Sequence, residues 1–266
     1  HDSMIERDDR VASMAAEGIE FFAATDHDYI SDLQPVVENM GLGDRIRAIP
    51  GLESTPFAYG HFNGWPLDVD DESPNKGAVD WARGMEGFSM IPGEIFSALR
   101  DRGAQLVQIN HARTPAGILS DFMSFFDRAG LKFDYENRFV YGDFEGAPVP
   151  NEWLRLPNTS LWDDTFNSLE VWNEFNMVDT NGDGIFEDER LDRLLRDWFN
   201  FTSFGLEITP IANSDCHTLV VDPIGIPRTM VRVADDSMGA IASGEITNAV
   251  IDTLAGRNDT PRDVVL

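Results

Sequence analysis

Histidine and acidic residues recur at the ends of short apolar runs in this sequence. His27 follows Asp26 in the segment TDHD, His111 ends an apolar run in NHAR, and Asp215 and His217 lie two apart in NSDCH. Imidazole and carboxylate groups are the ligands that Zn²⁺, Mn²⁺ and Fe²⁺ use in proteins. The pattern therefore predicts a site for divalent transition metals.

Two further segments add to this set. GLEST contains Glu53 and GHFNG contains His61, so four of the five histidines lie beside an acid or at a strand end, with Glu170 a looser match. Carboxylates gathered at one place repel each other unless cations neutralise them. The alternatives are a metal-free polar cluster at the strand ends or, for any single histidine, an ordinary hydrogen-bonded position.

A strand-helix alternation is expected to position these residues. Helical patterns precede the apolar runs, and parallel strands bring their C-terminal ends to one side of a sheet or barrel. Residues 60–90 are expected to form a long loop and residues 130–165 an irregular insertion. The expected helices cover 4–18, 32–41, 93–103 and 189–205, and the expected strands lie within 19–28, 45–55, 104–113, 167–175 and 206–217.

Composition narrows the classes of protein. The 266 residues are 42% hydrophobic, which suits one large domain, and no apolar stretch approaches the roughly 20 residues of a membrane helix. With 47 acidic against 20 basic residues the net charge is −27, which disfavours nucleic acid as a partner and favours an extracellular or periplasmic setting. One cysteine excludes an internal disulfide.

Five segments taken in order resemble the motifs of the PHP (polymerase and histidinol phosphatase) superfamily. The Gly-x-Glu that is followed closely by Gly-His-Phe-Asn is most similar to the CehA/McbA-like metallohydrolase branch, and the resemblance runs over nearly the whole chain. It implies one α/β domain over residues 1–266, a distorted (β/α)7 PHP-type barrel with loop insertions. The five segments are TDHD at 25–28, GLEST at 51–55, GHFNG at 60–64, NHAR at 110–113 and NSDCH at 213–217.

The resemblance also implies two or three divalent metals (Zn, Mn or Fe) at the mouth of the barrel. Glu53 would bridge two metals, His61 and His111 would complete one of these sites, and Asp215 would bind the other. The remaining histidines would hold a third metal, with Asp26 a ligand or a support for one. The implied ligands are His1, Asp26, His27, Glu53, His61, His111, Asp215 and His217.

One feature of the family has no counterpart in these residues. Its first strand ends in a His-x-His pair just upstream of the position of His1. We therefore expect the chain to continue beyond both ends, with that strand missing here. If the site is instead incomplete, the alternative is a secreted calcium-binding structural or adhesive module on an inactive barrel. Exonuclease activity, as in polymerase-associated relatives, is disfavoured by the acidic charge.

The implied reaction is hydrolysis by a metal-bridging hydroxide of a phosphoester, carbamate or amide bond in a small molecule. The sequence contains no Gly-x-Ser-x-Gly elbow, so this motif gives no sign of a protein nucleophile. His217 or His61, if not fully committed to a metal, would protonate the leaving group, and Asp26 is a further candidate catalytic residue. Arg113 and Arg228 would bind an anionic substrate, or else form structural salt bridges.

A second metal is predicted in the segment DTNGDGIFEDER, residues 179–190. Its oxygen ligands and central glycine follow the spacing of an EF-hand calcium loop, although Arg190 stands where the bidentate acid is expected, so Asp188 or Glu189 would replace it. The alternative is an acidic turn without an ion. The predicted calcium ligands are Asp179, Asn181, Asp183, Ile185 and Glu187.

The alternation of a strand gives one more expectation. If the segment ending in NSDCH is extended, Asp215 and His217 share a face and Cys216 points the opposite way, into packing. The cysteine would then be a small apolar filler.

Overall fold

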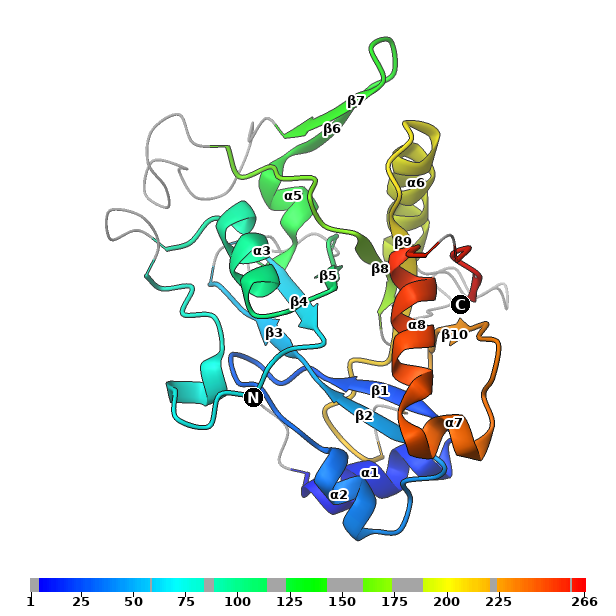
Figure 1. The fold of residues 1–266 in the computed structure, drawn as a ribbon. Coiled ribbons are helices and arrows are strands. Elements are labelled where there is room, and N and C mark those ends of the chain that lie inside the picture. The colour runs from blue at the N-terminus through cyan, green and yellow to red at the C-terminus, as the bar shows by residue number, and fades with distance from the viewer. Residues whose placement is uncertain are drawn as a thin grey trace.

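The computed structural model describes most of the chain (Figure 1). His1 and residues 179–188, which include the five predicted calcium ligands, lie outside the described residues. The described ranges are 5–57, 59–83, 89–113, 123–142, 160–173, 189–220, 224–258 and 260–266.

Helices and strands alternate over much of this length. The helices are α1 (Arg7–Ala16), α2 (Gln34–Asn39), the 3-10 helix η1 (Pro74–Gly77), α3 (Pro92–Asp101), α5 (Phe125–Ala129), α6 (Glu189–Ser203), α7 (Met238–Ser243) and α8 (Glu245–Ala255). The strands are β1 (Phe21–Ala24), β2 (Arg47–Pro50), β3 (Leu52–Ser54), β4 (His61–Trp65), β5 (Leu106–Asn110), β6 (Leu131–Asp134), β7 (Phe139–Gly142), β8 (Ser168–Asn173), β9 (Thr209–Asn213), β10 (Met230–Val231) and β11 (Val264–Val265).

The central sheet has the strand order β3-β4-β5-β8-β9. β4 runs antiparallel to β3 and β5, whereas β5, β8 and β9 are parallel. β1 pairs in parallel with β2, and only Gly51 separates β2 from β3, so one bent segment joins the two sheets. The fold is therefore mixed α/β, and the described residues form no closed barrel.

The four predicted helices and five predicted strands are present, but residues 60–90 are not wholly a loop. β4 occupies residues 61–65 and is buried throughout. This strand is hard to predict from the sequence because it contains glycine and asparagine, which are uncommon in strands. Gly64 is needed because a Cβ there would lie 2.7 Å from Leu99 of α3, so the missing side chain lets helix and strand approach closely. The predicted insertion at 130–165 likewise contains the hairpin β6-β7.

Alternation along β4 and β5 separates a core face from a site face. Phe62 and Ile109 face the aromatic core under α3 and α5. The opposite face, the site face, changes from apolar to polar along three cross-strand pairs. These are Trp65 opposite Leu106, then Asn63 opposite Gln108, then His61 opposite Asn110. Its apolar end packs against α8. The polar end therefore opens at the edge where β5 finishes.

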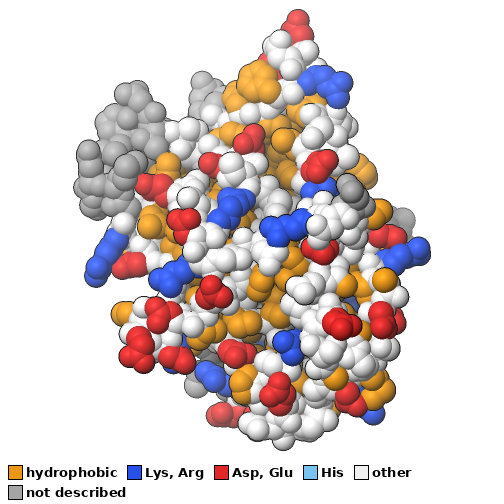
Figure 2. Space-filling view, viewed as in Figure 1, with side chains coloured by type: hydrophobic (Ala, Val, Ile, Leu, Met, Phe, Trp, Pro, Cys, Tyr) orange, Lys and Arg blue, Asp and Glu red, His pale blue; other side chains and the backbone are white. Residues whose placement is uncertain are grey.

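The surface shown in Figure 2 mixes both signs of charge, with basic side chains lying singly among acidic ones. None of the described helices is long and apolar enough to cross a membrane.

Candidate metal centre

Glu53, in the middle of β3, lies at the centre of a histidine cluster. Its Oε1 is 3.1 Å from His61 Nδ1 and 3.8 Å from His111 Nε2, and its Oε2 is 3.6 Å from His27 Nδ1. His61 begins β4, His111 follows β5 and His27 follows β1, so three strands supply the rings. Metal-binding atoms of His27, Glu53 and His61 all lie within 4.8 Å of one another. The structure thus brings four predicted ligands together.

The spacing of these atoms fits a bound cation. His61 Nδ1 and His111 Nε2 face each other at 3.1 Å. Ligands about 2.1 Å from a tetrahedral metal stand roughly 3.4 Å apart, close to this separation and to that of His61 from Glu53. His111 Nδ1 is buried without a hydrogen-bond partner among the described residues, so no protein contact fixes the tautomer from that side. A divalent cation would satisfy the three converging atoms at once.

Electrostatics of the metal-free centre show which of its groups are charged. Burial would lower the pKa of His111, but the hydrogen bond and charge of Glu53, with Glu170 and Asp215, raise the pKa to about 9. Burial would raise the pKa of Glu53, yet His111 and His61 hold this pKa well below its ordinary value. Burial lowers the pKa of His61. Without metal the centre is therefore an ion pair of Glu53 with protonated His111, whose proton a metal would replace.

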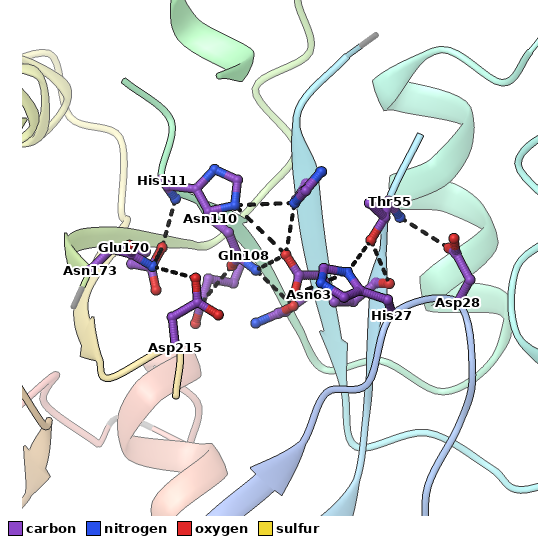
Figure 3. A network of polar contacts seen from close by, with 12 residues as sticks. His27, Asp28, Thr55, Asn63, Gln108, Asn110, His111, Glu170, Asn173 and Asp215 are labelled. Carbon is purple, nitrogen blue, oxygen red and sulfur yellow. Dashed lines mark hydrogen bonds and ion pairs between the residues drawn. The ribbon is translucent and has the colours of Figure 1, made fainter. Parts of the chain in front are cut away.

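Amide side chains that sequence reasoning missed hold Glu53 in place; they belong to Asn63, Gln108 and Asn110, which Figure 3 labels. Asn110 Nδ2 donates to Glu53 Oε1 at 3.0 Å and to Asn63 Oδ1 at 2.9 Å, and Gln108 Nε2 donates to Asn110 Oδ1 at 2.8 Å. The signal was available: His-x-Asn-x-Trp in β4 and Leu-x-Gln-x-Asn in β5 both alternate with period two. These amides form the polar half of the site face.

A second cluster surrounds Glu170 in β8 (Figure 3). The carboxylate accepts from His111 N at 2.6 Å, Asn173 Nδ2 at 3.1 Å and Asn213 Nδ2 at 3.0 Å. Asn173 Nδ2 also donates to Asp215 Oδ2 at 3.1 Å. Burial and the charge of Asp215 raise the pKa of Glu170 to about 7. The two carboxylates therefore share one amide donor.

A cavity of about 340 Å³ adjoins both clusters. Glu53, Glu170, Asp215 and His217 belong to its polar wall, as does Asp26, and Trp65 belongs to its apolar wall. His217 Nε2 lies 3.8 Å from Asp215 Oδ1, and about a third of the His217 side chain is exposed. A small molecule entering this cavity would reach the predicted ligands on one side and apolar groups on the other.

The two predicted arginines lie in different surroundings. Arg113 donates through Nε and Nη2 to Asp197 at 2.5 and 3.2 Å and through Nη1 to Asp127 at 2.6 Å, so its guanidinium binds α6 and α5. Arg228 lines the cavity, but its Nε donates to Gly225 O and its Nη1 to Glu17 O.

The expectation for Cys216 is wrong. β9 ends at Asn213, and Asp215 has a φ of +44°, so strand alternation does not extend to this residue. Cys216 Sγ accepts from Arg10 Nη1 at 3.0 Å and contacts Thr218 O at 2.9 Å on the cavity wall. The thiol makes polar contacts rather than filling an apolar gap.

Comparison with known proteins adds little. No protein-family model and no curated protein matches the sequence. Among solved structures, a two-domain protein from Bacteroides vulgatus, described as containing a predicted PHP-like metal-dependent phosphoesterase, aligns with a TM-score of 0.47 and 16% identity. The alignment covers 94% of this chain and 59% of that one, so the present chain spans about three-fifths of that protein. Similarity this low establishes neither fold nor activity.

Proposed function

We propose that this protein is a metal-dependent hydrolase of the PHP type, nearest to the CehA/McbA-like branch, acting on a phosphoester of a small molecule. The observation that carries the proposal is the convergence of His27, His61 and His111 on the buried carboxylate of Glu53. Imidazoles that converge on a carboxylate are a common ligand set for divalent transition metals. Asp215, on the wall of the same cavity, would help Glu53 to hold a second metal, and His217 would help His27 to hold a third.

Divalent cations bound there would activate water and neutralise the negative charge that develops on the substrate. The chain's own residues would hold and orient the reactants. Asn110 fixes the rotamer of Glu53. If His217 is not committed to a metal, its side chain is exposed enough to give a proton to a leaving group. Arg228 and Asp26 line the cavity, and in this proposal they would contact an anionic substrate and water. The same arrangement would also serve a carbamate or amide.

The proposal includes a (β/α)7 barrel. Among the described residues β1 pairs with β2 alone and β9 with β8 alone, and the cavity is lined by both outer strands. Thr229 Oγ1 accepts from Ala212 N and donates to Ala212 O, so a side chain satisfies the outer edge of β9 where a strand would otherwise pair. A further strand beside β9 would have to displace these bonds of Thr229 to Ala212.

A hydrolysis assay tests the proposal. The protein would be stripped with a chelator, reloaded with Mn²⁺ or Zn²⁺, and assayed with an aryl phosphate and an aryl carbamate. We expect hydrolysis that depends on the metal and falls at least about 100-fold in Glu53→Gln, which keeps the shape of the side chain and loses its charge. Failure of the reloaded protein to bind metal and to hydrolyse either compound would leave the inactive binding module as the better account.

We also propose that residues 179–190 bind calcium and that the protein works outside the cytoplasm, where calcium is plentiful. The support is the spacing of Asp179, Asn181 and Asp183 in the sequence. Calcium should raise the melting temperature of the wild type and leave that of Asp183→Ala unchanged. An equal rise in the melting temperature of both proteins would show that the stabilising calcium does not bind at this loop.

A further inference from the structure

Glu170 is the most enclosed carboxylate of the region, with 2% of its surface exposed. Its hydrogen-bond donors come from the ends of three adjacent parallel strands: His111 N after β5, Asn173 at the end of β8 and Asn213 at the end of β9. The Glu170 side chain is therefore hydrogen-bonded to the ends of three strands. Charge-assisted bonds of this kind are shorter and stronger than neutral ones, and the bond to His111 N is 2.6 Å long.

The backbone conformation at His111 shows the effect of its hydrogen bond to Glu170. Asn110 lies on the site face opposite His61, so regular alternation would turn the next side chain toward the core face. His111 instead has a φ of +27°, an unfavourable conformation for a residue with a side chain, and its ring meets His61 and Glu53 on the site face. The bond from His111 N to Glu170 holds the backbone in this turn.

The same carboxylate is linked to Asp215. Asn173 Nδ2 donates to Glu170 Oε2 and to Asp215 Oδ2, each at 3.1 Å. Asp215 also has a positive φ, of +44°, just beyond the end of β9. Glu170 thus supports two predicted ligands that both depart from strand geometry.

The donors around Glu170 argue against a role as a metal ligand itself. Oε1 accepts from Asn213, and Oε2 accepts from both His111 N and Asn173. N–H groups point at each oxygen, so a cation approaching either one would meet the positive ends of these dipoles.

We propose that Glu170 is a positioning residue: it binds no metal, and it sets the turn at His111 and, through Asn173, the carboxylate of Asp215. This inference rests on the proposed function in that the positioned groups serve the metal centre. Partners that orient metal ligands typically change metal affinity 10- to 100-fold when they are lost.

The test compares Glu170→Gln with the matched control Asn167→Asp. Asn167 also ties β5 to β8, accepting from Val107 N and donating to Gln105 O, but at the opposite end of these strands. Glu170→Gln places an amide NH₂ against existing donors, whereas Asn167→Asp changes one amide far from His111. Both substitutions preserve side-chain shape.

Two readouts are needed. The chain has only five histidines, so selective ¹⁵N-histidine labelling allows the His111 amide to be followed by NMR in the metal-free protein. We expect this amide to exchange at least about tenfold faster in Glu170→Gln than in the wild type and in Asn167→Asp. Co²⁺ titration should show affinity lowered 10- to 100-fold in Glu170→Gln, with an altered visible spectrum and an unchanged number of bound ions.

Loss of one whole equivalent of Co²⁺ in Glu170→Gln would overturn the proposal in favour of a ligand role. Unchanged exchange of the His111 amide, or an equal loss of affinity in Asn167→Asp, would also overturn it. If Glu170→Gln does not fold, Asn213→Ala is tested in its place, because it removes only the donor to Oε1. It should speed the exchange of the His111 amide and lower the Co²⁺ affinity, each by less than Glu170→Gln would. No change in either quantity would also overturn the proposal. If the wild type binds no Co²⁺, the proposed function fails while the amide exchange still tests the positioning.

Discussion

Raising the pH should destabilise the metal-free protein through His111. The folded-state pKa of this residue is raised from 6.5 to about 9, chiefly by Glu53 acting against burial. A raised pKa gives stability that is fully present below pH 6.5 and is lost as the pH rises through about 9. At about 1.4 kcal/mol per pH unit the whole contribution is about 3 kcal/mol, and about 2 kcal/mol of it should disappear between pH 7.5 and 9.5.

Urea unfolding at constant ionic strength, with a chelator present, measures this loss. Glu170 also has a raised pKa, about 7, so its contribution is mostly lost before the window begins. Glu53→Gln is the control, because it removes the largest cause of the shift and should make the free energy of unfolding nearly independent of pH in this range. Saturating Zn²⁺ should do the same, since a metal-bound His111 carries no proton at that nitrogen.

A wild-type free energy of unfolding that stays constant within about 0.5 kcal/mol from pH 7.5 to 9.5 would refute the reasoning. The same slope in Glu53→Gln would show that another group titrates, and would remove the Glu53–His111 ion pair from the account.

Three substitutions test other parts of the structure. Arg113→Lys should lower the free energy of unfolding by about 2 kcal/mol in urea, because lysine cannot reproduce the two bonds to Asp197, and bound metal should stay constant; loss of metal with full stability would count against this. Gly60→Ala should cost about 2–4 kcal/mol by the same assay, since φ is +93° and the new Cβ would lie 2.8 Å from Phe125 N, and a neutral effect would contradict the packing. Cys216→Ser should change stability by less than about 0.5 kcal/mol and leave metal content intact, because a hydroxyl can keep both polar contacts; metal loss would make the thiol a ligand.

Much of the fold could be predicted because its strands obey simple patterns. β5 and β9 are apolar runs that end in polar residues and follow helices, which is the signature of buried parallel strands. β4 is not an apolar run of this kind. It alternates with period two, but its Asn63 and Gly64 are uncommon in strands and are accounted for only by Asn110 and Leu99, which they contact in the fold. The period was visible in the sequence, whereas these long-range contacts were not.

The candidate site could likewise be predicted only in part. The types and positions of Glu53 and His61 pointed to a metal centre, and the structure brings them together. The neighbourhood of Arg113 could not be foreseen, because Asp197 lies 84 residues further along the chain. Positive φ angles at His111 and Asp215 interrupt the strand geometry, and the ring of His111 reaches the site although regular alternation would turn it toward the core. Such turns depend on tertiary hydrogen bonds, which a sequence does not display.

Anomalous scattering at the zinc edge, from crystals of the Zn²⁺-loaded protein, tests the central claim most directly. We expect a peak about 2.0–2.2 Å from Glu53, His61 and His111 together, the range of zinc bonds to carboxylate oxygen and imidazole nitrogen. Zinc found only on exposed acidic side chains, with the histidine cluster empty at saturating metal, would contradict it.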